Sequence, residues 1–280
     1  MSLFLTLYLL CCFTAHASFQ IKTEIHDIDD SQPNETLIFL TSGHVVRINK
    51  NERAIKHDLK NAKERHQSLK MTLSNHHKIE RYSILPFISP QAQKEFVPNK
   101  RSNETYSPTI IANMDLVKTY FMESRYVNKE SQCFNRAHIW SYEWFIKSSI
   151  NSNKTWIFFT RRYIRKFKFD WWFHVSPSVR VIEDGIEREK IMDVKYARGP
   201  LDPKKWTDIF MKDDANCPLV KVYSEYANFP ESGSCYTMRT SMLYYQPVDI
   251  ESKETWETVR ANWYETEIKQ AYLEAFDEVL

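Results

Sequence analysis

One predicted β-hairpin constrains the fold of this chain more than any other feature. The run from Trp171 to Glu183 is rich in aromatic and β-branched residues, and Asp184-Gly185 follows as a turn signal. Lys190 to Tyr196 is the second candidate strand. If the turn has two residues, position 174 lies opposite 195 and position 193 lies opposite 176.

This register brings a histidine and a carboxylate together. His174 and Asp193 share one face as diagonal neighbours, about 7 Å apart at the backbone, so the carboxylate can reach the imidazole. Asp170 is on the same face but lies about 13 Å along the same strand, at about 3.3 Å per residue. Asp184 lies in the turn. Asp193 is therefore the preferred partner for any turn of even length, because a one-residue slip reverses the face.

Cys133 is the one thiol of the mature chain that has no expected partner. Cys133, Ala137, Trp140 and Trp144 recur at helical spacing, which predicts an amphipathic helix beginning near Cys133 with Ser131 as its N-cap. A helix N-terminus lowers a thiol pKa and offers N–H donors to an oxyanion, as a nucleophilic cysteine requires. The alternative is a small buried cysteine at the start of a core helix.

Other polar residues near Cys133 are assigned mainly structural roles. His138 lies about 140° around the helix from Cys133, which predicts a packing role. Arg136 lies closer to the cysteine face, and a helix-anchoring salt bridge is preferred over a direct effect on the thiolate. The seven remaining histidines are expected on the solvated surface, among them His57, His66, His76 and His77.

Three sequence blocks together resemble the bacterial secreted protein-glutaminase (protein-glutamine deamidase) family. They are Cys133-Phe-Asn-Arg-Ala-His138, Trp171-Trp-Phe-His-Val175 and Met192-Asp193. The resemblance covers about residues 110 to 250 and implies an α+β, papain/transglutaminase-like fold. It implies a Cys133–His174–Asp193 triad that hydrolyses side-chain amides of protein-bound glutamine through a thioester, with protein or peptide substrates and with no metal or organic cofactor.

Two other classes of function remain open. The same triad can cleave peptide bonds, as in a cysteine protease, or transfer the acyl group to an amine, as in a transglutaminase. The chain can also be a non-enzymatic exported binding module in which Cys133 belongs to the core.

The first 17 residues predict export. Met1 to Ala17 has no charged side chain, contains an apolar run from Leu3 to Phe13, and ends in Ala15-His16-Ala17, a small-x-small cleavage pattern. A signal peptide cleaved near Ala17 implies a secreted or periplasmic protein. The run is too short for a stable membrane span, and no later segment is long and apolar enough.

Export to an oxidising compartment changes how the remaining cysteines are interpreted. In an oxidising compartment Cys217 and Cys235 can form a disulfide that closes a loop of about 19 residues. The absence of CxxC spacing argues against zinc. The formal charge of +2, from 38 basic and 36 acidic residues, favours neither nucleic acid nor a strongly acidic partner, and a monomer is expected.

Two regions are expected after the leader. Residues 18–105 form a smaller α+β accessory region or pro-region, with strands Thr36–Thr41 and His44–Asn49 and a polar linker at Pro98–Pro108. A helix follows these strands, with Ile55, Leu59, Ala62, His66 and Leu69 on one face. Residues 106–280 form the catalytic domain.

Further elements of the catalytic domain follow from the same patterns. They are a helix at 109–126, a strand at Thr155–Thr160, a short helix within 200–214, a strand at Cys235–Gln246 and a terminal helix at Glu254–Val279. The basic and aromatic run Arg161–Lys168 is interpreted as a solvated β-hairpin, in preference to a surface for nucleic acid or acidic peptide.

Overall fold

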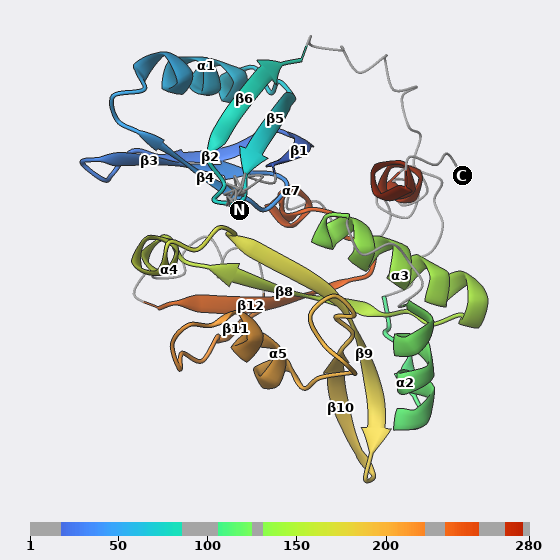
Figure 1. Ribbon diagram of the computed structural model, residues 1–280. Coiled ribbons are helices and arrows are strands. Elements are labelled where there is room, and N and C mark those ends of the chain that lie inside the picture. Colours follow the sequence, from blue (N-terminus) through green and yellow to red (C-terminus); the bar gives the residue numbers. More distant parts are fainter. Residues whose placement is uncertain (1–17, 86–105, 125–130, 222–232, 252–266, 277–280) are drawn as a thin grey trace, which may run out of the picture.

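The N-terminal unit, residues 18–85, contains two three-stranded antiparallel sheets and one helix. In the computed structural model of the chain, which describes residues 18–85, 106–124, 131–221, 233–251 and 267–276, the sheets have the orders β1-β5-β6 and β2-β3-β4. Figure 1 shows this unit, coloured blue to cyan, stacked on the rest of the chain. Its elements are β1 (Ser18–Thr23), β2 (Ile25–Asp29), β3 (Glu35–Leu40), β4 (Val45–Asn49), α1 (Arg53–Glu64), β5 (Leu69–Ser74) and β6 (Ile79–Ile84).

This unit has a hydrophobic core of its own. Leu69, Met71 and Leu73 alternate along β5 and are fully buried, together with Leu59 and Ala62 of α1. The predicted strand pair and helix are therefore present, but Leu69 belongs to β5 rather than to the helix. The helix ends earlier because the chain reverses just after Glu64, with a left-handed backbone at His66 (φ 49°).

The larger unit, the described residues from 106 onward, is built on a six-stranded sheet. Its order is β10-β9-β8-β12-β11, with β7 pairing parallel to β9. Its strands are β7 (Ile110–Ile111), β8 (Asn153–Phe159), β9 (Phe173–Glu183), β10 (Ile186–Ile191), β11 (Leu219–Val220) and β12 (Cys235–Ser241). Its helices are α2 (Met114–Glu123), α3 (Cys133–Ser148), α4 (Arg161–Phe167), α5 (Pro203–Phe210), α7 (Pro247–Glu251) and a helical segment at 267–276.

Helix α3 packs against β9, and this contact places Cys133 beside the sheet. Ala137, Trp140 and Trp144 of α3 are buried in the main hydrophobic core, as their spacing predicts. The N-cap is Gln132 rather than Ser131, and it makes no side-chain capping bond. The predicted cap was wrong by one residue, and the carbonyl of Ser131 instead accepts a hydrogen bond from Arg136 Nη1.

The hairpin of β9 and β10 has the predicted register. Glu183 pairs with Ile186 and Ser178 pairs with Ile191, and the turn residues Asp184 (φ 53°) and Gly185 (φ 75°) both have left-handed backbones. Two positive φ values are characteristic of the tight hairpin turn that Asp-Gly favours. The second strand, however, spans Ile186–Ile191 instead of 190–196.

The second strand ends early because the chain turns at Asp193. The carbonyl of Asp193 accepts backbone hydrogen bonds from Tyr196 and Ala197, at 3.3 and 2.9 Å. Asp193 therefore lies just beyond the ladder, and Met192 N still donates to Pro177 O at 2.8 Å.

Two further predictions of secondary structure were wrong. The helix expected from residue 109 begins at Met114, because Asn113 caps it by accepting from the N–H groups of Asp115 and Leu116. Arg161–Phe167 is helix α4 instead of part of a hairpin, Lys168 is its C-cap, and the Thr160 hydroxyl caps its start by accepting from Tyr163 N. The signal peptide, most of the Pro98–Pro108 linker and the first part of the terminal helix lie outside the described residues.

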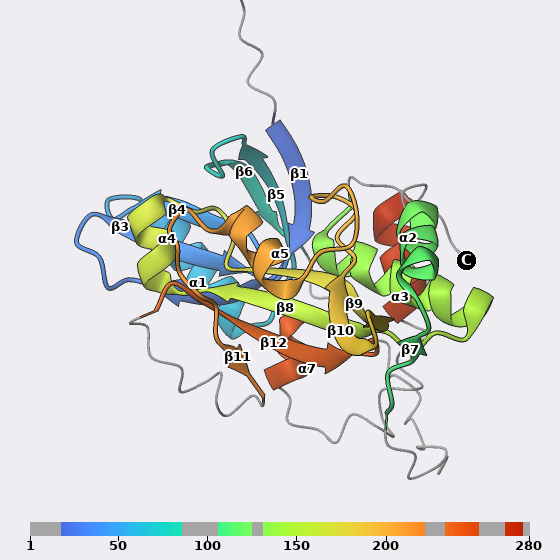
Figure 2. The same cartoon turned by 90° about the horizontal axis from the view of Figure 1, so that it is seen from below.

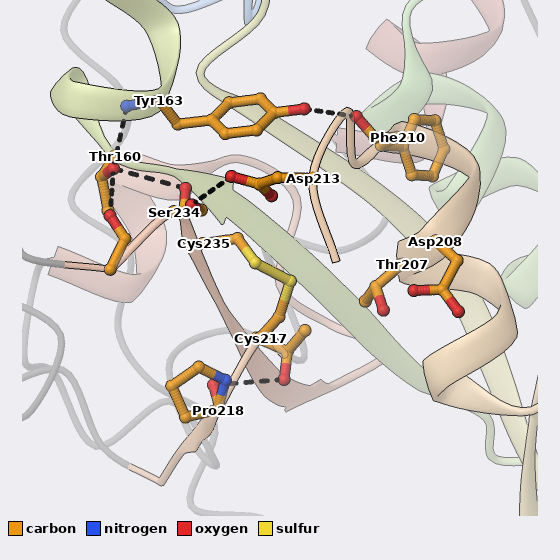
Figure 3. Close-up of a disulfide and its surroundings, with 12 residues drawn as sticks. Thr160, Tyr163, Thr207, Asp208, Phe210, Asp213, Cys217, Pro218, Ser234 and Cys235 are labelled. Atoms are coloured by element: carbon orange, nitrogen blue, oxygen red, sulfur yellow. Dashed lines mark hydrogen bonds between the residues drawn. A yellow bond between two sulfur atoms is a disulfide. The ribbon is translucent and has the colours of Figure 1, made fainter. Parts of the chain in front are cut away.

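A disulfide joins Cys217 to Cys235, at the start of β12 and next to β11 (Figure 3). Cys235 is fully buried. Around it, Thr160 Oγ1 donates to Gly233 O and Ser234 Oγ donates to Asp213 Oδ2, at 2.8 and 2.9 Å. Cys133 is the free cysteine of the described residues. Across the same residues, no helix has both the length and the apolar character needed to cross a membrane.

The Cys217→Ala/Cys235→Ala double variant tests the stabilising effect of the disulfide. A loop of this length contributes about 3 kcal/mol to the free energy of unfolding in the chain-entropy model. Urea denaturation of the non-reduced wild type and the double variant should show a loss of that order. Peptide mapping should find the two cysteines linked and Cys133 alkylated alone; a disulfide containing Cys133 would contradict the pairing.

Candidate active site

Cys133 opens onto a cavity between the two units. The cavity has a volume of about 530 Å³, and Cys133, Arg136, His174 and Tyr196 of the larger unit line it. Cys133 is half-buried, and as the first residue of α3 it lies where free backbone N–H groups point outward. The cysteine is therefore both accessible and in an electropositive position.

His174 and Asp193 form a buried pair behind the thiol. His174 Nε2 lies 2.7 Å from Asp193 Oδ2, and both side chains are almost completely buried. Trp206 Nε1 of α5 donates to the same carboxylate oxygen at 2.8 Å. The hairpin register brings the histidine and the acid together, and α5 holds the acid from the other side.

The remaining ring nitrogen of His174 is available to Cys133, and the thiol and imidazole are hydrogen-bonded. Burial alone would lower the pKa of His174, but the negative charge of Asp193 and its hydrogen bond raise that pKa to about 9. Burial would raise the pKa of Cys133, but its hydrogen bond with His174 and the charges of His174 and Arg136 bring it below its ordinary value. The geometry therefore favours a thiolate–imidazolium pair near neutral pH.

Arg136 combines the two roles considered for it. Its side chain bonds back to the carbonyl of Ser131, which fixes the start of α3. Its charge also contributes to lowering the pKa values of Cys133 and Asp193. The effect on the thiolate was given the smaller share in the sequence interpretation, yet the position of Arg136 at the cavity wall supports it.

Aromatic rings surround the imidazole on several sides. Trp171 stacks on His174 at 6.0 Å between ring centroids, and Tyr196 meets it edge-on at 5.2 Å. Phe210 lies at 4.7 Å. These rings exclude water from the His174–Asp193 pair, which strengthens its electrostatic interaction.

His138 does not join this group. Its Nδ1 lies 2.5 Å from Lys154 Nζ, and its ring packs against Tyr245 at 4.7 Å, so it belongs to the core behind α3. Asp170 is likewise directed elsewhere, and its carboxylate accepts a hydrogen bond from Arg47 Nη1 at 2.8 Å.

The prediction that the other histidines are solvated was wrong for three of them. His44 is buried and lines the cavity, and burial together with the charge of His77 lowers its pKa to about 3. His26 stacks on Trp172 at 4.3 Å, and burial lowers its pKa to about 4. His77 lies against His44 and Asp170. All three lie where the two units meet, which no local sequence pattern reveals.

The N-terminal unit supplies the other wall of the cavity. It contributes Phe19, Gln20 and Ile21 from β1 and the turn Ser42-Gly43-His44. Trp172 N donates to Gly43 O at 3.0 Å, and Val45 N donates to Asp170 O at 2.8 Å, so this turn is hydrogen-bonded to the segment just before His174.

Trp206 is the functional residue that the sequence interpretation missed. Trp206 had been noted only as an apolar member of a short helix, and no local signal indicates that its indole reaches Asp193. Among the described residues, no group of three or more His, Cys, Asp or Glu side chains is arranged to hold a metal ion.

Two solved structures have a fold similar to that of this chain. Two crystal structures, of pro-protein-glutaminase and of a mutant of it, superpose with a TM-score of 0.50 each, at 13% and 12% identity. The first match covers 90% of this chain and 92% of the other, and the second covers 80% and 83%. The chain therefore has the papain/transglutaminase-like α+β fold of the protein-glutaminases.

The sequence comparison agrees on the family. Residues 112–210 match the model of the family described as glutaminase, and this segment contains Cys133, His174 and Asp193. The matched family is the one that the sequence resemblance indicates for this part of the chain. No curated protein sequence matches the chain.

The Asp193→Asn variant tests the charge coupling in the site. In the wild type, Cys133 should react with iodoacetamide at neutral pH faster than an ordinary thiol, because its pKa is lowered. Removing the negative charge lowers the pKa of His174 from about 9 and weakens the ion pair, so the alkylation profile should move to higher pH. Asp184→Asn, in the hairpin turn, is the matched control. An unmoved profile in Asp193→Asn would contradict the coupling.

Proposed function

We propose that the chain is a protein glutaminase that hydrolyses the side-chain amide of protein-bound glutamine and releases ammonia. The observation that carries this proposal is the continuous hydrogen-bonded series from the Cys133 thiol through His174 to the buried carboxylate of Asp193. The glutaminase-family segment that contains all three residues supports glutamine as the substrate.

The chemistry follows from the charges of the pair. The Cys133 thiolate attacks the amide carbon, and the backbone N–H of Cys133 at the start of α3 stabilises the oxyanion. The His174 imidazolium gives its proton to the leaving nitrogen, so that ammonia departs and a thioester remains. Neutral His174 then takes a proton from water, hydroxide attacks the thioester, and glutamate is released as the thiolate re-forms. Asp193 holds the imidazole orientation and stabilises its charged form through both half-reactions.

The N-terminal unit acts in this proposal as an inhibitory pro-region. It lines the cavity opposite Cys133 and is hydrogen-bonded to the backbone at Asp170 and Trp172. The fold match that covers 90% of the chain is to a protein named pro-protein-glutaminase, which supports the same organisation. A tethered inhibitor needs little intrinsic affinity, because a short linker gives an effective concentration in the millimolar range.

Export is part of the proposal. The leader-like first 17 residues point to a secreted or periplasmic enzyme that works as a monomer. The disulfide between Cys217 and Cys235 supports an oxidising compartment.

Substitution of the three proposed catalytic residues tests the function. Cys133→Ala should abolish ammonia release from a glutamine-containing protein. His174→Ala should lower turnover by about 10²- to 10⁴-fold, because it removes the general acid and base. His138→Ala, the control histidine, should mainly lower stability. Near-normal turnover in His174→Ala would eliminate the assignment, and substrate cleavage without ammonia would indicate a protease.

Limited proteolysis between residues 98 and 105 tests the inhibitory role. Cleavage followed by removal of the N-terminal fragment should raise ammonia release and the rate of Cys133 alkylation together, because both require access to the same cavity. If both rates stay unchanged after clean removal, the N-terminal unit is an accessory domain.

A further inference from the structure

Helix α4 meets the N-terminal unit through a set of complementary charges. Every basic partner in this set comes from α4 or its C-cap, and every acidic partner comes from the N-terminal unit. The three pairs are Arg161–Asp27, Arg165–Asp29 and Lys168–Glu35. We call Arg161, Arg165 and Lys168 the basic face of α4. In Figures 1 and 2, α4 lies beside the β2-β3-β4 sheet.

The contacts along this face are well formed. Arg161 Nη2 lies 2.6 Å from Asp27 Oδ2, and its guanidinium lies over the ring of Phe39, 5.6 Å from the centroid. Lys168 Nζ lies 2.7 Å from Glu35 Oε1. The basic face therefore binds carboxylates of the N-terminal unit and, through Arg161, an apolar ring of the same unit.

The central pair is the most buried of the three. Arg165 contacts Asp29, whose side chain is 3% exposed, and also donates to Ser31 Oγ at 2.9 Å. Burial would raise the pKa of Asp29, but hydrogen bonds from Ser31 and Arg165 hold it below its ordinary value. The carboxylate is therefore ionised where it contacts α4.

The basic face is close enough to the cavity for one extended polypeptide segment to reach both. Asp27 pairs across the sheet with Phe39, and Phe39 precedes the cavity-lining Ser42 by three residues on the same strand and turn. Glu35, at the start of that strand, precedes Ser42 by seven residues. At about 3.3 Å per residue these intervals correspond to about 10 and about 23 Å.

We propose that the basic face of α4 binds acidic segments of the protein substrate, on one side of the glutamine that enters the cavity. The N-terminal unit already shows that an acidic polypeptide can occupy the face and the cavity mouth together. This inference rests on the proposed function, because the N-terminal unit must move away before a substrate takes its place. The occupant is an extended segment with carboxylates about three to seven residues from the glutamine.

Peptide binding tests the surface without relying on activity. The full chain is cut between residues 98 and 105, diluted until the N-terminal fragment dissociates, and titrated with a fluorescent acidic peptide that lacks glutamine. Fluorescence anisotropy should show binding that weakens about 3- to 10-fold in Arg165→Gln/Lys168→Gln and weakens with added salt. The uncut chain should bind far less, because the N-terminal unit covers the face.

Two further variants serve as controls. Lys118→Gln/Lys147→Gln removes two exposed lysines that are also paired with carboxylates, but away from the cavity. Lys168→Gln alone changes a mostly exposed side chain, so it should not affect folding. It should weaken binding of the acidic peptide, but less than Arg165→Gln/Lys168→Gln does. Equal binding by the uncut chain and by the cut chain after the N-terminal fragment has dissociated, or an equal loss in the control double variant, would overturn the proposal.

Two glutamine peptides then separate this inference from the proposed function. One carries acidic residues three to seven positions from the glutamine, and the other has serine at those positions. The ratio of their kcat/KM values is independent of how far the N-terminal unit has opened, because both peptides meet the same open population. A ratio above one that falls toward one in Arg165→Gln/Lys168→Gln supports the face. A ratio of one with active enzyme rejects it, whereas peptide binding without ammonia release rejects only the glutaminase function.

Discussion

The buried carboxylate of Asp193 is the interaction on which the rest of the site depends. Burying an unpaired charge costs several kcal/mol, and here that cost is offset by His174 and by the indole of Trp206, which bind the same oxygen. The carboxylate in turn raises the pKa of His174 inside a shell of aromatic rings, and the charged imidazole lowers the pKa of Cys133. The hairpin, α3 and α5 must therefore all be in place before the thiol is activated.

The N-terminal unit is attached to the larger unit by buried apolar side chains as well as by surface contacts. It has its own core, but Leu37, Phe39 and Val45 belong to the main core of the larger unit. A fully buried apolar side chain contributes about 1.5 to 3 kcal/mol, so exposing three of them opposes release. If the unit is inhibitory as proposed, cutting the linker removes the high effective concentration but leaves these contacts, so activation also requires that the fragment be diluted or degraded.

The features predictable from the sequence are those set by local periodicity and turn chemistry. The Asp184-Gly185 turn and the alternation along β9 set the register that brings Asp193 near His174, although β10 ends at Ile191 and Asp193 lies just beyond the ladder. Prediction failed where distant segments meet. Trp206 reaches Asp193 only through the tertiary packing of α5, and contacts between units bury His44 and half-bury His26 and His77. Arg161–Lys168 was misread because interleaved basic and aromatic residues fit a short capped helix as well as a strand.

The near-neutral composition illustrates the same limitation for charge. A formal charge of +2 favoured neither nucleic acid nor a strongly acidic partner, yet the structure places acidic residues of the N-terminal unit against basic residues of α4. Opposite charges that cancel in the net charge can lie on different parts of the molecule. Here the acidic residues of the N-terminal unit cover the basic face of α4, so the net charge does not reveal that face. Net charge therefore describes the intact chain, whereas recognition after removal of the N-terminal unit depends on the local charge left on α4.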